Sequence, residues 1–341
     1  SEPGPACYGK GGNAATVTDA SLLLGYLDPD YFAGGTVVLQ KNRAHTAIAN
    51  GIAQPLGLTE AEAALGIHRV LNSQMAEGIR AVSVRRGHDP RSFTLVALGG
   101  AGPLHAIALA EELGIRRILV PPHPGVLSAQ GLLDATVEHE ITTAFGHDLT
   151  ALSPPDLAQA YGKIDTQARG LIAREGIAPE ACSVRHYADV CFVGQSHYLG
   201  VPVDLTGPDP ITAIYQTFLE THDRINGHRF EAPAKIINLH TVHRAPAASG
   251  GSAQPRATAT GEIIKKARRT VHLPGNDGAV EVAVLDRATM TPGQTIIGPA
   301  IIEQADATTL LTSGWSALVS PSLTLILEQF SQTGTDEDDN H

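Results

Sequence analysis

The chain has 341 residues, of which 43% are hydrophobic, 17% are charged and only 4% are aromatic. This length predicts two domains, and the apolar content is sufficient for sizeable cores packed mainly by aliphatic side chains. The 24 Lys and Arg residues against 35 Asp and Glu residues give a net charge of −11, which argues against a nucleic-acid-binding surface.

The cysteine content and the hydropathy bear on the cellular compartment. Cys7, Cys182 and Cys191 are widely spaced and form neither a zinc pattern nor a disulfide framework, which favours a reducing compartment. The sequence shows no signal peptide and no apolar run of about 18 residues. We therefore expect a cytoplasmic protein without a membrane span.

The first glycine-rich block is GPACYGKGG, which contains Cys7, Tyr8, Gly9, Gly11 and Gly12. Its glycines would let the backbone approach a ligand closely. A catalytic thiolate at Cys7 would need a nearby base or a helix N-terminus, and the local sequence shows neither. A packed small residue is therefore favoured over a nucleophile at this position.

Asp19 is the main acidic candidate near this block. It follows the β-branched run Thr16-Val17-Thr18, which predicts a position at a strand end. A carboxylate there could bind Mg²⁺, which prefers hard oxygen ligands, directly or through water, or it could orient a nucleophile. Asp28 lies near the same block and could hold the ion together with Asp19. The alternative is a helix cap for residues 20–25, which the local sequence favours, and the two roles can coexist.

The next part of the chain predicts alternating helices and strands. Thr59 and Glu62 form a capping box that begins an amphipathic helix, and Gly87 is its natural stop. The elements predicted after it are a strand over residues 93–98, a helix from Pro103 to Gly114 and a strand over residues 117–120. This alternation indicates a partly parallel sheet with helices on its faces.

The second glycine-rich block connects the first of these strands to the helix. Gly99, Gly100, Ala101 and Gly102 form a tight loop, and His105 follows in the first helical turn. Such a loop aims backbone N–H groups and the positive helix end at an anion, usually a phosphate. The alternative is an ordinary strand-to-helix connection. His105 occupies the place of the last glycine in a dinucleotide fingerprint, and it can face a phosphate or an adenine.

The second half of the chain has a different order of predicted helices and strands. The predicted helices cover residues 157–175 and 211–226, and the predicted strands cover residues 184–192, 198–203, 236–244 and several short segments within 270–327. A flexible linker is expected over residues 245–261, and a turn is expected between His139 and His147. None of the 15 histidines belongs to an HExxH motif.

Six segments resemble the hydantoinase/5-oxoprolinase family and, within it, the ATP-binding type A subunit and its relatives in acetone and acetophenone carboxylases. They are GPACYGKGG, TVTDASLLLGYLDPDYFAGG, RRGHDPRSFTLVALGGAGPLHAIALAEELGI, PPHPGVLSAQGLL, FVGQSHYLGVPV and IIEQADATTLLTSGWSALV. The similarity runs from Ser1 to about Leu327 in the family's order. The family normally has several hundred residues before the first segment, including a phosphate-binding hairpin that has no match here. We therefore expect the C-terminal portion of a longer polypeptide, or one piece of a split or cleaved subunit.

The resemblance implies an α/β fold in which residues 1–140 form the C-terminal lobe of an actin-like (ribonuclease H-like) ATPase. A mixed α+β accessory domain over residues 141–330 and an acidic, disordered tail over residues 331–341 would follow. In such folds ATP lies in a cleft between two lobes. The resemblance favours nucleotide binding by the loop of Gly99, Gly100, Ala101 and Gly102, with His105 beside it. From the residues themselves we expect Asp19 to serve catalysis and metal binding, and we expect a loop on the substrate side that contains Cys7, Tyr8, Gly9, Gly11 and Gly12.

The resemblance also implies ATP and Mg²⁺ as cofactors of a cyclic amide hydrolase that phosphorylates a lactam or carbonyl oxygen before hydrolysis. The implied partners are an N-terminal ATPase lobe, a type B hydantoinase subunit in a hetero-oligomer, and a small cyclic amide or ketone, with no nucleic acid and no membrane. One alternative is a subunit of an ATP-dependent ketone carboxylase. Another is a non-catalytic assembly or regulatory subunit of the same fold.

Overall fold

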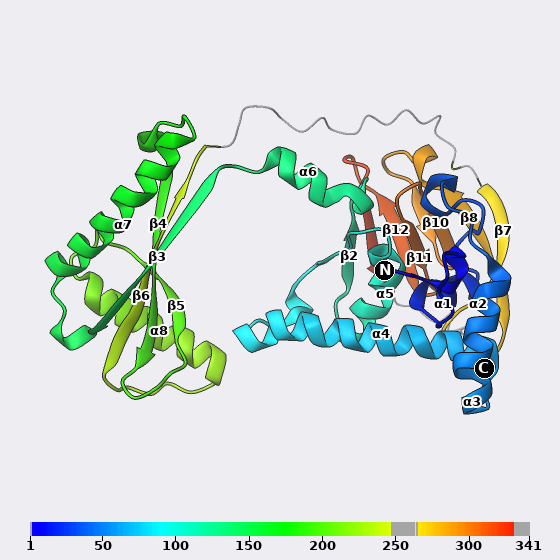
Figure 1. The fold of residues 1–341 in the computed structure, drawn as a ribbon, viewed down its shortest axis with the longest axis horizontal. Helices are drawn as coiled ribbons and strands as arrows, with labels where there is room; N and C mark the ends of the chain where they lie inside the picture. The colour runs from blue at the N-terminus through cyan, green and yellow to red at the C-terminus, as the bar shows by residue number, and fades with distance from the viewer. Residues whose placement is uncertain (1, 247–262, 264, 331–341) are drawn as a thin grey trace, which may run out of the picture. The chain divides into compact units, whose positions relative to one another are not determined.

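The computed structural model describes residues 2–246, 263 and 265–330, which form two compact units. Unit 1 contains the described residues within 1–84, 88–130 and 253–341, and unit 2 contains residues 85–87 and the described residues within 131–252. Figure 1 shows the elements of each unit. The expected acidic tail and most of the expected linker lie outside the described residues.

This division differs from the boundary expected at residue 140. Strand β13 (Leu325–Gln329) pairs antiparallel with strand β2 (Arg117–Val120), so the C-terminal strands belong to the same unit as the N-terminal helices. The expectation of one accessory domain over residues 141–330 is therefore corrected, because only its first part forms unit 2. Local sequence patterns do not reveal a pairing between strands that are so far apart along the chain.

Helices make up the N-terminal part of unit 1. They are η1 (Ala6–Tyr8), α1 (Val17–Leu23), η2 (Phe32–Gly35), α2 (Lys41–Ile48), the π-helical turn η3 (Ala49–Ala53), α3 (Gln54–Leu56) and α4 (Glu60–Val82). The predicted capping box of α4 is confirmed, because the Thr59 hydroxyl accepts from the Glu62 N–H and the Glu62 carboxylate accepts from the Thr59 N–H. Helix α4 ends at Val82, before the stop predicted at Gly87.

A five-stranded sheet has the order β1-β2-β13-β12-β9. Its remaining strands are β1 (Leu95–Val96), β12 (Trp315–Val319) and β9 (Thr295–Ile297). Strand β1 is shorter than predicted but runs parallel to β2, as the alternation indicated, and α5 (Gly102–Leu113) connects the two. The left-handed residue Gly114 ends α5, which confirms that prediction.

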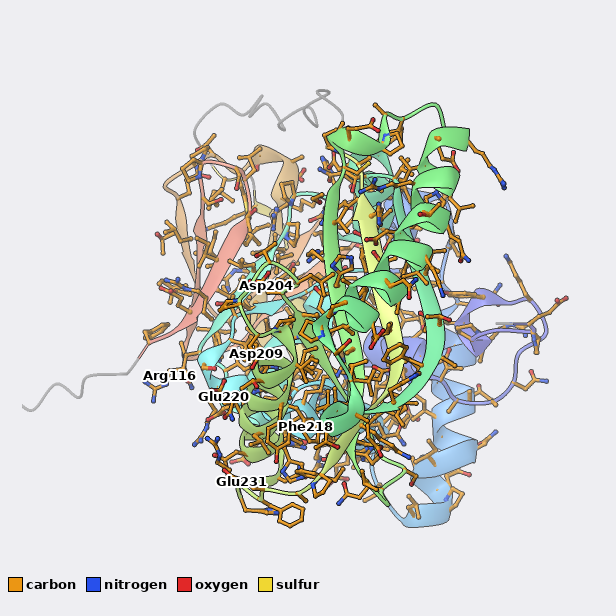
Figure 2. The ribbon with its side chains drawn as sticks, turned by 90° about the vertical axis from the view of Figure 1, so that its left-hand side faces the viewer. Arg116, Asp204, Asp209, Phe218, Glu220 and Glu231 are labelled. Atoms are coloured by element: carbon orange, nitrogen blue, oxygen red, sulfur yellow. The ribbon has the colours of Figure 1, made fainter. Side chains whose placement is uncertain are left out.

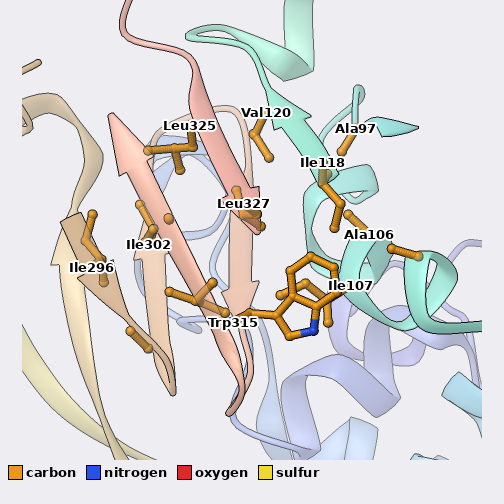
Figure 3. Close-up of a cluster of buried hydrophobic side chains, with 14 of the residues drawn as sticks. Ala97, Ala106, Ile107, Ile118, Val120, Ile296, Ile302, Trp315, Leu325 and Leu327 are labelled. Carbon is orange, nitrogen blue, oxygen red and sulfur yellow. The ribbon is translucent and has the colours of Figure 1, made fainter. Parts of the chain in front are cut away.

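A second sheet of unit 1 has the order β11-β10-β8-β7. It consists of β7 (Lys265–His272), β8 (Ala279–Asp286), β10 (Ala300–Glu303) and β11 (Thr308–Leu311), with the short helix η9 (Arg287–Thr289) after β8. Figure 3 shows the core on which the first sheet and α5 meet, where Trp315 and Leu327 lie close to Ile107 and Ile118. Residues from both ends of the chain thus share one core.

Unit 2 is an antiparallel sheet of order β3-β6-β4-β5 packed against two helices. Its elements are β3 (Glu138–Asp148), η7 (Leu149–Ala151), α7 (Pro154–Arg174), η8 (Pro179–Ala181), β4 (Ser183–Phe192), β5 (Leu199–Val203), α8 (Pro210–Asn226) and β6 (Ala234–Arg244). Tyr161 of α7 and Phe218 of α8 are buried in one cluster with the sheet, and Figure 2 marks Asp209 and Phe218 at α8.

Strand β3 is an element that the sequence did not predict. His139 and His147 both lie on it, so the turn expected between them is wrong. More and less exposed positions alternate along the strand up to Gly146, and the alternation ends beside a register shift between Ala144 and His147. Such a bulge interrupts the period of two on which strand prediction depends.

The short helices η6 (Pro124–Val126) and α6 (Leu127–Asp134) follow β2. No helix in the described part of the chain has both the length and the apolar character needed to cross a membrane. All three cysteines are free thiols; Cys7 and Cys191 are buried and Cys182 is partly exposed.

Candidate functional site

Unit 1 contains a pocket of about 370 Å³. Four segments of the chain form its walls, namely Tyr8 with Val17, Thr18 and Ser21 of α1, residues 27–33, the start of α5, and residues 303–308 between β10 and β11. This volume lies within the range of small-molecule sites, and much of the lining is apolar.

The glycine-rich loop reaches this pocket at the start of α5. Gly100, Ala101 and His105 line the pocket, whereas Gly99 and Gly102 do not. Gly99 adopts a left-handed φ of 82° and donates its N–H to the Pro124 carbonyl at 2.7 Å. Ala101 caps α5 without a side-chain hydrogen bond, so the positive end of the helix lies beside the pocket.

Two glycines allow the 303–308 segment to pack against this loop. A Cβ atom at Gly125 would lie 2.5 Å from the Asp306 carbonyl oxygen, and one at Gly100 would lie 3.1 Å from the same atom. The Gly125 N–H and the Gln304 side-chain amide donate to the Asp306 carboxylate at 2.9 and 2.6 Å. The close approach therefore fixes this wall of the pocket in place.

Strand β7 neutralises two carboxylates of the pocket wall. Arg269 Nη2 donates to Asp28 Oδ2 at 2.8 Å and to Glu303 Oε1 at 2.7 Å. Lys266 Nζ lies 3.6 Å from Glu303 Oε2 and 3.5 Å from the centroid of the Tyr31 ring. Glu303 is only 3% exposed, and a charge buried to this degree needs such partners.

A buried polar cluster forms the inner wall of the pocket. The Ser21 hydroxyl donates to the Val17 carbonyl at 2.9 Å and lies 2.9 Å from His68 Nε2. The His68 and His105 rings stack with their centroids 4.9 Å apart, and His105 Nδ1 lies 2.9 Å from Asn72 Oδ1. His68 and Asn72 line a second cavity of about 150 Å³. The cluster thus separates two cavities.

Burial determines the protonation state of the two histidines. It lowers the pKa of His68 to about 3, with a further contribution from neighbouring His105, and it lowers the pKa of His105. Both rings are therefore neutral near pH 7. Because the Ser21 hydroxyl already donates to the Val17 carbonyl, it accepts from His68 Nε2–H.

Asp19 does not lie at a strand end, contrary to the sequence expectation. It is the third residue of α1 and forms a capping box with Thr16. Its fully buried carboxylate accepts from the N–H groups of Ala6 (3.2 Å), Cys7 (2.7 Å) and Thr16 (3.0 Å) and from the Thr16 hydroxyl (2.7 Å). These four donors occupy the oxygens that a metal ion would need, so Asp19 does not fit direct Mg²⁺ coordination.

No group of three or more His, Cys, Asp or Glu side chains arranged for a metal ion occurs within the described ranges. Among the wall carboxylates, Asp28 and Glu303 already bind Arg269, and Asp306 binds the Gly125 N–H. We therefore derive no step that depends on a metal from these residues.

Cys7 is fully buried beside Asp19. Burial raises the pKa of its thiol to about 12, and a hydrogen bond to the Asp19 carboxylate adds to the effect. The thiol is therefore protonated at neutral pH, and this geometry supports the packed, unreactive role favoured by the sequence.

The pocket brings together Tyr8, Gly100, Ala101 and His105 from the two glycine-rich blocks. The other residues expected to form a substrate-side or nucleotide-side loop do not line it, namely Cys7, Gly9, Gly11, Gly12, Gly99 and Gly102. Gly12 packs against the Gly4 carbonyl, where a Cβ atom would overlap it. That glycine serves a close approach within the block itself.

Sequence reasoning missed the 303–308 wall, the 27–33 wall except Asp28, and the inner cluster except His105. Residues 27–33 and 303–308 belong to segments that resemble the family, but they carry no motif with a recognisable chemistry. A signal for the cluster did exist, because His68 and Asn72 lie four residues apart on α4 and therefore on one face of it, where the helix meets α5.

The sequence is similar to a known protein family and to subunits of known enzymes. Residues 1–141 match the family model described as Hydantoinase/oxoprolinase. The chain is 32% identical to the caprolactamase subunit alpha of Pseudomonas jessenii over 334 residues, covering 94% of this chain and 47% of that protein. It is 30% identical to the acetophenone carboxylase gamma subunit of Aromatoleum aromaticum, covering 91% of this chain and 44% of that protein.

The fold is also found among solved structures. The crystal structure of the ATP-dependent caprolactamase from Pseudomonas jessenii matches with a TM-score of 0.85 and 30% identity, covering 97% of this chain and 49% of that chain. The expected resemblance is thereby confirmed. The chain spans about half the length of the relatives that it matches.

Proposed function

We propose that the chain is part of an ATP-dependent hydrolase of cyclic amides, because residues 1–141 match the Hydantoinase/oxoprolinase family model and the chain is similar to a caprolactamase in sequence and in fold. The bound nucleotide would supply a phosphoryl group to a lactam or carbonyl oxygen. That oxygen is a poor leaving group, whereas phosphate is a good one, so phosphorylation would prepare the ring for hydrolysis. The relatives named for ATP-dependent caprolactam hydrolysis support this choice of substrate class.

The observation that carries the proposal is the pocket at the start of α5. Gly100 and Ala101 line it beside the positive end of the helix, and the 303–308 segment is held against Gly100. We propose that ATP binds there, with His105 on the inner wall. The chain's own contribution to catalysis would be positioning and backbone hydrogen bonding, because Asp19 is occupied by protein donors.

We further propose that unit 1 includes part of the C-terminal lobe of an actin-like ATPase. The half of the relatives' length that this chain does not cover would then supply the other lobe, either in the same polypeptide or in a separate one. A type B hydantoinase subunit, Mg²⁺ held outside Asp19 and a cytoplasmic location complete the proposal. The three free cysteines support the location.

A ketone carboxylase of the same family is the second candidate. The 30% identity with an acetophenone carboxylase subunit is close to the 32% identity with the caprolactamase subunit, so identity does not separate the two. The two activities do differ in their need for bicarbonate.

The test is ATP hydrolysis by the complete enzyme, with caprolactam or 5-oxoproline and with acetophenone or acetone, each with and without bicarbonate. We expect hydrolysis that depends on the cyclic amide and not on bicarbonate. Turnover that requires both a ketone and bicarbonate would favour the carboxylase, and binding of nucleotide without any turnover would favour a non-catalytic subunit.

A variant of the pocket tests the location of the nucleotide. Gly100→Val places a branched side chain against the Asp306 carbonyl and should weaken ATP binding by about tenfold or more. Gly131→Val, in a helix position with open space, is the matched control and should bind ATP normally. Unchanged ATP affinity in a normally folded Gly100→Val enzyme would move the nucleotide elsewhere.

A further inference from the structure

The two nitrogen atoms of His105 have different and fixed roles. Asn72 Oδ1 is a carbonyl oxygen and can only accept, so His105 Nδ1 carries the hydrogen of this 2.9 Å bond. Burial lowers the pKa of His105, which keeps the ring neutral and leaves Nε2 as a bare acceptor. The tautomer is thus set by a residue on the neighbouring helix α4.

The acceptor nitrogen opens on the pocket. His105 lines the 370 Å³ pocket and does not line the smaller cavity behind it. Within the described ranges His105 Nε2 has no hydrogen-bond partner. It does not belong to the buried side-chain atoms that lack a partner, so it remains accessible. It is therefore positioned to accept a hydrogen bond from a bound molecule.

We propose that His105 Nε2 selects the adenine base by accepting a hydrogen bond from its exocyclic 6-amino group, and that Asn72 is the positioning residue for this contact. The inference rests on the proposed nucleotide function of the pocket. Adenine presents an amino donor at its 6-position, whereas hypoxanthine and guanine present an oxygen acceptor there. An acceptor facing an acceptor would repel those bases.

The same geometry argues against a phosphate at this position. A phosphate oxygen needs a donor, and the donor nitrogen of His105 is already bound to Asn72. The Asp306 carboxylate, which binds two amide donors and not a cationic side chain, also lines the pocket and would repel a phosphate group beside it. Apolar walls such as Leu104 and Phe32 are instead suited to a flat base, so the phosphates would lie away from His105, towards the positive end of α5 at Gly100 and Ala101.

The first test compares the affinity of the complete enzyme for ATP, for ITP, which carries an oxygen at the 6-position, and for the triphosphate of unsubstituted purine riboside. We expect ATP to bind at least about tenfold more tightly than ITP, because an unpaired buried acceptor is costly. The unsubstituted analogue should lie between them. The His105→Phe variant should bind ATP and ITP with similar affinity.

A second variant changes the protonation of His105 and not its size. In Asn72→Asp, the new carboxylate keeps Nδ1–H bound and raises the pKa of the imidazole. Lowering the pH from 8 to 5.5 should then protonate Nε2 and shift the preference from ATP towards ITP. The wild-type preference should stay constant over this range, because the neutral ring of His68 stacks on His105. The carboxylates that line the same pocket already bind Arg269 or amide donors, namely Asp28, Glu303 and Asp306.

Asn42→Asp makes the same chemical change at an exposed position of α2 and should leave the preference unaltered at every pH. Equal affinity of the wild-type enzyme for ATP and ITP, or an unchanged preference in His105→Phe, would overturn the inference while leaving the ATP-dependent function intact. Failure of all three nucleotides to bind would contradict both the inference and the proposed function of the pocket.

Discussion

At the scale of single residues, the Asp19 carboxylate binds two elements of the structure at once. The sequence pointed to it as a metal ligand or a helix cap, and the structure favours an extended form of the second role. Its oxygens hold the start of α1 through Thr16 and also hold η1 through the N–H groups of Ala6 and Cys7. Asp19 therefore joins the first glycine-rich block to the helix behind it.

This role predicts the effect of Asp19→Asn on stability. An asparagine offers one acceptor oxygen where the carboxylate accepts four hydrogen bonds, and its NH₂ group would face a backbone N–H. We expect the free energy of unfolding to fall by roughly 1–3 kcal/mol, the cost of leaving buried donors unsatisfied. Urea unfolding would measure it, with Asp30→Asn at an exposed position as the control. Equal stability of the two variants would restore Asp19 as a candidate metal ligand.

Residue identities in the pocket could be predicted where a motif carries chemistry. Gly100, Ala101 and His105 were found from the loop and helix-start pattern, and all three line the pocket. Gly125 and Asp306 were not found, because the need for a glycine arises only when the two distant segments pack against each other. A contact of this kind leaves no periodic trace in the sequence.

At the scale of elements, long helices were predictable and β3 was not. Helix α4 has a capping box and a sustained apolar stripe, which specify it locally. Strand β3 is half exposed and rich in Thr, His and Glu, and its bulge breaks the alternation. Strand β1 was predicted too long because its flanking apolar residues Phe93 and Leu98 are exposed in the structure and not paired.

The packing of α4 against α5 predicts a pH dependence of stability. The pKa of His68 is about 3 in the folded state, against about 6.5 in an unfolded chain. Below pH 6.5 the unfolded state binds a proton at this residue and the folded state does not, so stability falls as the pH falls. We expect His68 to account for a loss of about 2 kcal/mol between pH 7 and pH 5.

Urea unfolding at these two pH values measures this loss. The His68→Phe variant should show a smaller decrease in the free energy of unfolding than the wild-type chain, although it loses the bond to Ser21 at both pH values. His88→Phe changes an exposed histidine and should keep the full decrease. An identical pH dependence in all three proteins would show that His68 is not buried in its neutral form.

At the scale of the whole molecule, unit 1 is discontinuous in sequence. Its first sheet places β13 directly beside β2 and β12 beside β13, and its core combines Trp315 and Leu325 with Ile118. Sequence patterns predicted the alternation of elements up to β2, but they did not predict the pairing of β13 with β2. The partner of a strand is set by packing between segments that lie far apart in the sequence. The middle of the chain, by contrast, has a core of its own.

This arrangement predicts opposite behaviour for two fragments. The fragment of residues 131–246 contains all four strands of its sheet and both helices that cover it, so it should fold alone and unfold cooperatively. The fragment of residues 1–130 retains only β1 and β2 of the five-stranded sheet and loses the side chains that bury Ile107 and Ile118. We expect it to lack a cooperative transition, because too little apolar surface remains buried to offset the conformational entropy of folding.

Circular dichroism during thermal unfolding would measure both fragments. Mixing 1–130 with a separate 263–330 fragment should restore the transition if the shared core is the cause, and a cooperative transition in 1–130 alone would show that the N-terminal segment is a domain without its C-terminal strands.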